Sequence, residues 1–238
     1  IIGKLNIVAL FLYLTLNSYA QLSGTKTIGT GGDYTTIGAA VTDLETKGVN
    51  GPVIFNIKNG TYAAQVSINN IQGISKTNNV LFQSETKSAS NVTIYYSPAG
   101  TNDNWVLLLD STDYISFKHI KFLNTASGSY TRVVYLNGNC LNVKFSNSIF
   151  ETNATTDYSN SSKALFYSYN DIIDSLSLDS NTFTGGSFAV YHYSASGSYT
   201  SKGVSITNNT IKSRSGIYVY YNDAISISNN KFRGTDYK

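Results

Sequence analysis

The chain has 238 residues, of which 41% are hydrophobic and only 13% are charged, which is the composition of a folded protein and not of a disordered one. Its 26 asparagines against three glutamates favour turns over long helices and argue against a helical bundle. The formal net charge of +3 is too small to predict a nucleic-acid partner, and the single cysteine excludes an internal disulfide framework and a multi-cysteine metal site.

The start of the chain has the three-part pattern of a secretory signal peptide. Lys4 precedes an apolar run over residues 5–16 that is too short to span a bilayer. Ser18 and Ala20 are the small residues expected just before a cleavage site. We therefore expect residues 1–20 to be a signal peptide, and the mature chain to be secreted or displayed on the outer cell surface without a membrane span. The alternative is an N-terminal anchor helix or a first buried strand.

A helical segment is expected next. Apolar residues spaced for one helix face predict an amphipathic helix over residues 37–47: Ile37, Ala40, Val41 and Leu44. Such a helix can cover the end of a stack of β-strands, which would otherwise expose its core and unpaired backbone groups. Residues 48–51 end the helix, and residues 52–57 read as the first strand of a coil that spans residues 48–68.

An eight-residue pattern then recurs through the second half of the chain. Its first and third residues are apolar and its second is polar, which is the alternation of a strand with one buried face. The five copies occupy residues 115–122, 143–150, 176–183, 204–211 and 225–232, and they end 21 to 33 residues apart. A further short apolar strand precedes each copy, at residues 106–109, 133–135, 164–167, 189–191 and 216–220.

Repeats of this length with two or three strands each predict a right-handed parallel β-helix. The irregular spacing argues against a leucine-rich repeat, and a β-propeller blade would be about twice as long. Asparagines follow the strands within the repeats and suit a sharp turn, in which their amides can form an internal ladder: Asn147, Asn181, Asn208, Asn209, Asn229 and Asn230. The fold class is therefore all-β, a solenoid with a short N-terminal capping helix.

The segment from residue 26 to residue 68 resembles a known family. Residues 32–40, 53–57 and 60–62 are similar to the opening of pectin methylesterases and of other pectin-lyase-like β-helix proteins. Together with the export signal and the Asn-rich coils, the chain also resembles large secreted surface proteins of Bacteroidetes-type bacteria. This resemblance implies a β-helix of residues 21–238 that continues beyond residue 238.

The esterase resemblance implies catalysis by two Asp side chains, with Gln side chains and an Arg in a Gly-Arg-Pro-Trp segment. These motifs do not occur here, because the single tryptophan is Trp105, neither Pro52 nor Pro98 follows an arginine, and no Gln-Asp pair is present. A lyase of this superfamily would need a Lys or Arg base and acidic side chains that hold Ca²⁺. The candidate bases are Lys118, Lys144 and Arg132.

Lys118 and Lys144 occupy equivalent or nearly equivalent positions in their repeats, so we expect them about 5 Å apart on neighbouring coils. Solvated lysines on an outer face are the alternative. No ladder of carboxylates for Ca²⁺ is visible in the sequence, and His119 and His192 have no partners in a recognisable catalytic motif, so we expect them to be structural. We expect no cofactor, with Ca²⁺ needed only by a lyase.

Tyrosines concentrate in the strands that precede the repeats. In a coiled stack they would lie near one another and form a platform for sugar rings. The predicted ligand-binding residues are Tyr135, Tyr167, Tyr191, Tyr218 and Tyr220. The alternative is a stack of rings that only stabilises an exposed sheet.

These observations predict a monomeric secreted or cell-surface protein that binds extracellular polysaccharide or another surface ligand. Two alternatives stay open. One is a polysaccharide lyase or glycoside hydrolase, which needs clustered acids and a base on one face. The other is an adhesin or structural stalk without enzymatic activity, which needs only the repeats and the export signal.

Overall fold

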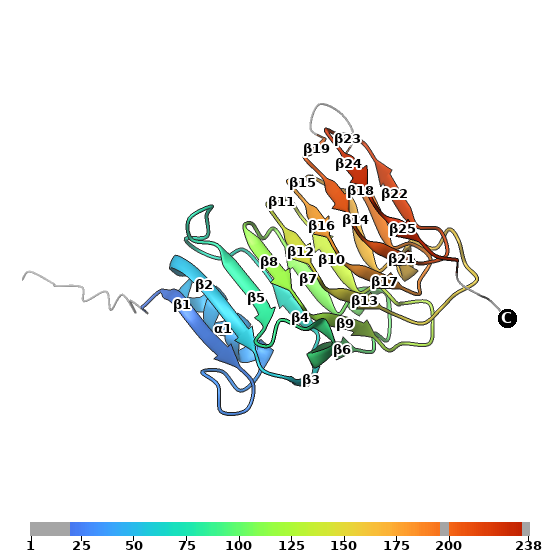
Figure 1. Ribbon diagram of the computed structural model, residues 1–238. Helices are drawn as coiled ribbons and strands as arrows, with labels where there is room; N and C mark the ends of the chain where they lie inside the picture. Colours follow the sequence, from blue (N-terminus) through green and yellow to red (C-terminus); the bar gives the residue numbers. More distant parts are fainter. Residues whose placement is uncertain (1–19, 196–199, 235–238) are drawn as a thin grey trace, which may run out of the picture.

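The computed structural model describes residues 20–195 and 200–234, and it consists of three parallel sheets that wind around one core (Figure 1). The predicted signal peptide lies almost entirely outside this part of the chain. Consecutive strands pass from one sheet to the next, so each coil contributes one strand to each sheet. This is the predicted parallel β-helix.

We name the three large sheets A, B and C. Sheet A contains, in spatial order, β1 (Leu22–Ile28), β2 (Val49–Ile57), β5 (Val80–Ser84), β8 (Ile115–Lys118), β12 (Lys144–Ser146), β16 (Ser177–Asp179), β20 (Ser205–Thr207) and β24 (Ser226–Ser228). Sheet B contains β3 (Gly60–Ala63), β6 (Val92–Tyr96), β9 (Lys121–Asn124), β13 (Ile149–Glu151), β17 (Thr182–Thr184), β21 (Thr210–Lys212) and β25 (Lys231–Phe232). Sheet C contains β4 (Val66–Ile68), β7 (Leu107–Asp110), β10 (Val134–Asn137), β14 (Phe166–Asp171), β18 (Val190–Ser194) and β22 (Ile217–Tyr220).

Short elements fill the corners between these sheets. Two small parallel pairs join β11 (Cys140–Leu141) to β15 (Ile173–Asp174) and β19 (Ser201–Lys202) to β23 (Asn222–Asp223). Three short 3-10 helices occur at η1 (Ala89–Asn91), η2 (Thr101–Asp103) and η3 (Ser161–Lys163). The corners between sheets B and C carry the longer connections, which are rich in Ser, Thr and Asn.

The predicted repeats form the core. Within each of the first four copies the first, third and last residues are buried, as the alternation requires. The third positions stack from coil to coil, and the ring centroids of Phe82 and Phe117 lie 5.4 Å apart and those of Phe117 and Phe145 4.9 Å apart. The last positions form a second stack, with 4.8 Å between Phe150 and Phe183. Removal of these large rings from water is the main stabilising contribution.

The asparagine ladder is also present. The side-chain oxygen of Asn209 accepts a hydrogen bond from the backbone N–H of Asn181 at 2.8 Å, and that of Asn230 accepts from the N–H of Asn209 at 2.9 Å. Their side-chain nitrogens donate to backbone carbonyls, as in the 2.9 Å contact from Asn209 to Leu178. The preceding asparagines adopt left-handed backbone angles, with φ of +51° at Asn147, which Asn tolerates better than most residues.

The capping helix α1 (Ile37–Lys47) has its predicted bounds and buries its four apolar residues against the first coils. Thr36 caps its N-terminus by accepting a hydrogen bond from the N–H of Ala39 at 3.1 Å. Gly48 ends the helix with φ +65°, and a Cβ there would lie 2.4 Å from a backbone oxygen. Within residues 20–195 and 200–234, no helix has the length and apolar character needed to cross a membrane.

Two sequence expectations need correction. The segment at residues 52–57 is not the first strand, because β1 precedes the helix and pairs in parallel with β2. The last repeat is not buried, since Ile227 is 47% exposed and Phe232 is 62% exposed. Both lie on the edge strands of sheets A and B, where no further coil of the described chain covers them.

Candidate functional site

Seven tyrosines form two rows on the outer face of sheet C. In parallel strands without register slips, equivalent side chains lie one strand spacing apart, and residues two positions apart share a face. The first row contains Tyr135, Tyr167, Tyr191 and Tyr218, and the second contains Tyr169, Tyr193 and Tyr220. We call these seven residues the tyrosine face.

The rings of the tyrosine face are in contact along both rows. In the first row, the centroids of Tyr191 and Tyr218 lie 4.8 Å apart with an interplanar angle of 12°. Tyr135 meets Tyr167 edge to face at 5.2 Å and 65°. In the second row, Tyr193 lies 5.2 Å from Tyr220. These are the favoured stacked and T-shaped geometries, so the rows contribute to stability as well as shaping the surface.

Solvent exposure differs between members of the face. Tyr169 is 51% exposed, Tyr220 46% and Tyr218 37%, whereas Tyr167 is only 8% exposed. Tyr135, Tyr191 and Tyr193 are half-buried. Of the five predicted ligand-binding residues, Tyr218 and Tyr220 therefore present the most ring surface, and Tyr167 supports the face from below.

Arg132 covers Tyr167. The guanidinium carbon lies 3.5 Å from the centre of that ring and 5.6 Å from the centre of the Tyr135 ring, which is a cation–π arrangement. Its Nε donates to the backbone carbonyl of Ser161 at 3.1 Å. Burial lowers the pKa of Arg132 from its ordinary value, and the neighbouring tyrosines oppose that effect. The group stays charged, because arginine does not deprotonate in proteins.

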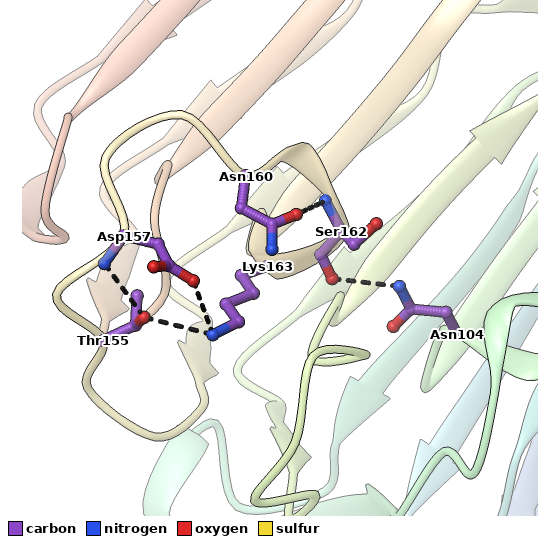
Figure 2. Close-up of polar contacts among 6 residues, drawn as sticks. All are labelled: Asn104, Thr155, Asp157, Asn160, Ser162 and Lys163. Atoms are coloured by element: carbon purple, nitrogen blue, oxygen red, sulfur yellow. Dashed lines mark hydrogen bonds and ion pairs between the residues drawn. The ribbon is translucent and has the colours of Figure 1, made fainter.

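The loop before β14, whose Ser161 carbonyl accepts the Arg132 hydrogen bond, is stabilised by polar contacts of its own (Figure 2). Lys163 forms an ion pair with Asp157 at 2.7 Å, and Asn160 accepts a hydrogen bond from the N–H of Ser162 at 3.0 Å. The carbonyl of Ser162 accepts from the side chain of Asn104 at 2.9 Å, which fastens the loop to the corner before β7, two coils away. This bracing positions the Ser161 carbonyl, and through it the Arg132 side chain, beside the tyrosine face.

The hydroxyls of four tyrosines of the face have a pKa above the ordinary value. Burial raises the pKa of Tyr135, Tyr167 and Tyr191 above the ordinary value. A hydrogen bond with Tyr221 raises the pKa of Tyr220. The hydroxyl of Tyr135 donates to the side-chain oxygen of Asn137 at 2.9 Å. The face therefore combines flat apolar rings with neutral hydroxyls that can donate and accept hydrogen bonds.

Two carboxylates of sheet C, Asp110 and Asp171, are the last residues of β7 and β14. Burial raises the pKa of Asp171, and the negative charge of Asp110 raises it further. Both charges also raise the pKa of Tyr135, so both lie within electrostatic range of the face. No motif in the sequence signals this coupling, because the two residues belong to coils two repeats apart. In the part of the chain that the structure describes, no group of three or more His, Cys, Asp or Glu side chains could hold a metal ion.

The three predicted bases do not form one cluster. Lys118 and Lys144 are exposed on sheet A, while Arg132 lies beside sheet C. The strand register pairs Lys144 with Ser116 and Lys118 with Ser146, so the two lysines are offset by two positions instead of being direct neighbours. The expected separation of one strand spacing was therefore wrong.

The two histidines differ in their surroundings. His192 points into the core, where Nδ1 contacts the hydroxyl of Ser168 at 2.5 Å and Nε2 contacts the side-chain oxygen of Asn222 at 2.9 Å. Burial lowers the pKa of His192 to about 4. His119 occupies a left-handed turn position with φ +56°. Both have the structural setting that the sequence predicts.

Comparison with known proteins finds similar solved structures but no similar sequence. No family model and no curated protein matches the sequence. The pectin methylesterase from Aspergillus niger, solved with an N-acetylglucosamine stub, superposes with a TM-score of 0.55 at 19% identity, over 92% of this chain and 83% of that one. The chain therefore shares the parallel β-helix fold of that esterase. The deglycosylated form of the same esterase matches with a TM-score of 0.50 and 16% identity, over 91% of this chain and 83% of that chain.

Proposed function

We propose that the protein is exported and binds an extracellular polysaccharide along the tyrosine face. The observation that carries this proposal is the pair of in-register tyrosine rows, with the rings of Tyr169, Tyr218 and Tyr220 open to solvent. Flat aromatic rings stack on the apolar faces of sugars, and phenolic hydroxyls bond to their OH groups. A row that repeats at the strand spacing of about 4.8 Å suits a linear repeating ligand.

Two further observations support a polysaccharide ligand. Arg132 places a permanent positive charge beside the rings, where it can donate to hydroxyl or carboxylate oxygens. The similar solved structures are of a pectin methylesterase, whose name denotes action on a polysaccharide. The predicted signal peptide would deliver the domain to the compartment in which such polymers occur.

Hydrolysis of the bound polymer is a second candidate function. Asp171 is half-buried with a raised pKa, and the charge of Asp110 contributes to that shift. A carboxyl with a raised pKa and a second carboxyl group are the pair that glycosidases use as acid and base. In this candidate Asp171 donates the proton to the leaving oxygen and Asp110 acts as the base.

The binding test uses affinity electrophoresis in pectin, polygalacturonate and a neutral glucan. It compares one double tyrosine variant with one single tyrosine variant that serves as the control. Tyr218→Ala with Tyr220→Ala should weaken retention about thirtyfold, because each lost ring removes about 1 kcal/mol of binding energy. Tyr95→Ala is the matched control, since Tyr95 is a partly exposed tyrosine on β6 of sheet B and not on the sheet that carries the two rows. Equal retention of the double variant and the control would contradict the proposed binding face.

Release of reducing ends from the same polymers tests the second candidate. Turnover that disappears in Asp171→Asn and in Asp110→Asn would support hydrolysis. Turnover that depends on Lys144 or Arg132 and on added Ca²⁺ would support a lyase instead. Neither turnover nor retention on any polymer would favour the adhesin or stalk alternative.

A further inference from the structure

A polar pocket lies on the outer face of sheet A, away from the tyrosine face. Its volume is about 310 Å³, and its lining residues are Lys76, Asn79, Tyr114, Ser116, Asn142 and Lys144. Ser116 and Lys144 are register partners on β8 and β12. Residues 76 and 79 come from the turn before β5, so three successive coils contribute to the walls. We call this cavity the sheet A pocket.

The sheet A pocket is positively charged and contains no carboxylate. Lys76 and Lys144 both line it, and neither forms an ion pair within residues 20–195 and 200–234. Two like charges that share a pocket repel each other unless an anion lies between them. The other lining groups are hydroxyls and amides, which can donate hydrogen bonds to the same anion.

Tyr114 occupies a backbone position that disfavours tyrosine. Its φ is +45°, in the left-handed region, where a bulky side chain is uncommon. The same turn position, just before each repeat, is held in later coils by Asn142, Ser175, Gly203 and Ala224, also with positive φ. Asparagine and glycine adopt this conformation more easily. Both Tyr114 and Asn142 line the pocket from this turn position, and the tyrosine carries the larger conformational cost, as strained residues at binding sites do.

We propose that the sheet A pocket binds an oxyanion, namely a sulfate, phosphate or carboxylate group. Lys76 and Lys144 supply the positive charge, and Tyr114, Ser116 and the two asparagine amides supply directional hydrogen bonds. The anion can be free in solution or carried on a sugar, because both present the same oxygens. This site is separate from the proposed polysaccharide face, since it lies on a different sheet.

The experiment is a titration of the isotopically labelled full chain with sodium sulfate, monitored by amide chemical shifts, against sodium chloride at equal ionic strength. We expect saturable shifts confined to β8, β12 and residues 74–79. A parallel titration with galactose 6-sulfate and with galactose separates the two sources of the anion. Tighter binding of galactose 6-sulfate than of sulfate assigns a sugar-borne group, and equal binding assigns a free anion. Absence of saturable shifts with both anions would overturn the proposal.

Single-residue variants test whether sulfate binds in the sheet A pocket. Lys144→Met and Lys76→Met keep the aliphatic stem and remove the charge, and each should weaken sulfate binding at least tenfold. Lys118→Met is the control, because Lys118 is an exposed lysine on β8 outside the pocket, and its affinity should stay within twofold of the wild type. Equal weakening in all three variants would indicate a general charge effect and overturn the site.

Tyr114→Asn separates strain from binding. Asparagine is the residue at the equivalent turn of the next coil, so the variant should unfold at the same temperature as the wild type or at a higher one. Sulfate affinity should fall at least threefold. A lower unfolding temperature with unchanged affinity would remove Tyr114 from the site. The Tyr218→Ala, Tyr220→Ala protein should keep the full sulfate response, so failure of the polysaccharide proposal does not affect this test.

Discussion

The guanidinium carbon of Arg132 and the ring of Tyr167 are in direct contact, with 3.5 Å between the carbon and the ring centre. The cation lies over an outward-facing ring of sheet C and excludes solvent from it. This contact joins the loop between sheets B and C to the tyrosine face. It makes the charge beside the face a fixed feature and not a mobile side chain.

Arg132→Met should lower the free energy of unfolding by about 1 to 2 kcal/mol, because it removes the cation–π contact and one of the two hydrogen bonds to the Ser161 carbonyl, which also accepts from the N–H of Ala164. Urea unfolding followed by tyrosine fluorescence measures this change. Arg132→Lys keeps the charge but loses the planar stack, and it should give an intermediate value. A stability equal to that of the wild type would mean that the contact contributes nothing.

Asn209→Leu should destabilise the protein by about 2 to 3 kcal/mol. The Asn209 side chain is buried and joins two neighbouring coils through hydrogen bonds, so its loss leaves backbone groups unpaired. Asn147→Gly is the control, because Asn147 is an exposed turn residue with φ +51° that glycine also adopts. Denaturant midpoints of the two variants provide the comparison, and similar midpoints would exclude an energetic role for the ladder.

Phe145→Asp should abolish cooperative folding. The ring is fully buried between Phe117 and the next coil, and an unpaired charge there costs several kcal/mol, comparable with the whole stability of a domain. Phe232→Asp makes the same chemical change at an exposed residue and should leave the thermal transition in place. Circular dichroism melts distinguish the two, and an unchanged melt of Phe145→Asp would show that the register of the core is wrong.

Stability should fall as the pH is lowered from about 6.5 to about 4. His192 has a pKa of about 4 in the folded protein, whereas an unfolded histidine titrates near 6.5. Between these values the unfolded chain binds the extra proton, so acidification favours unfolding, by about 2 kcal/mol at pH 5 and about 3 kcal/mol near pH 4. Urea unfolding at a series of pH values measures this slope.

His192→Gln provides the reference for that slope. Glutamine can still bond to Ser168 and Asn222 but does not titrate, so the difference between the two proteins isolates the histidine. The variant should lose less stability than the wild type between pH 7 and pH 5. Parallel curves would mean that His192 is not buried in a neutral state.

The sequence predicted those parts of the fold that depend on local patterns. Alternation of apolar and polar residues identifies the buried positions of the repeats, because a strand sends successive side chains to opposite faces. The asparagines at the turns were readable for a similar reason, since few residues adopt their backbone angles. The helix at residues 37–47 had both a complete apolar face and clear end signals.

The features that were not predicted from the sequence depend on contacts between segments that are distant along the chain. β1 reads Leu-Ser-Gly-Thr-Lys-Thr-Ile and shows no alternation, and its pairing with β2 becomes visible only once α1 has turned the chain back. Arg132 reaches its position because a loop folds over the face, and the coupling of Asp110 with Asp171 spans two coils. None of these leaves a periodic signal in the sequence.

The in-register stacking of coils also determines how the tyrosine face can evolve. Each coil from β10 to β22 adds an apolar layer inside and one or two tyrosines outside, and its strands pair only with strands of the neighbouring coils. Duplication of a single coil would lengthen the row of rings by one strand spacing and leave the chemistry of the others unchanged. The length of polymer that the tyrosine face can contact therefore depends on the number of coils. Gene duplication can change that number without altering any other residue.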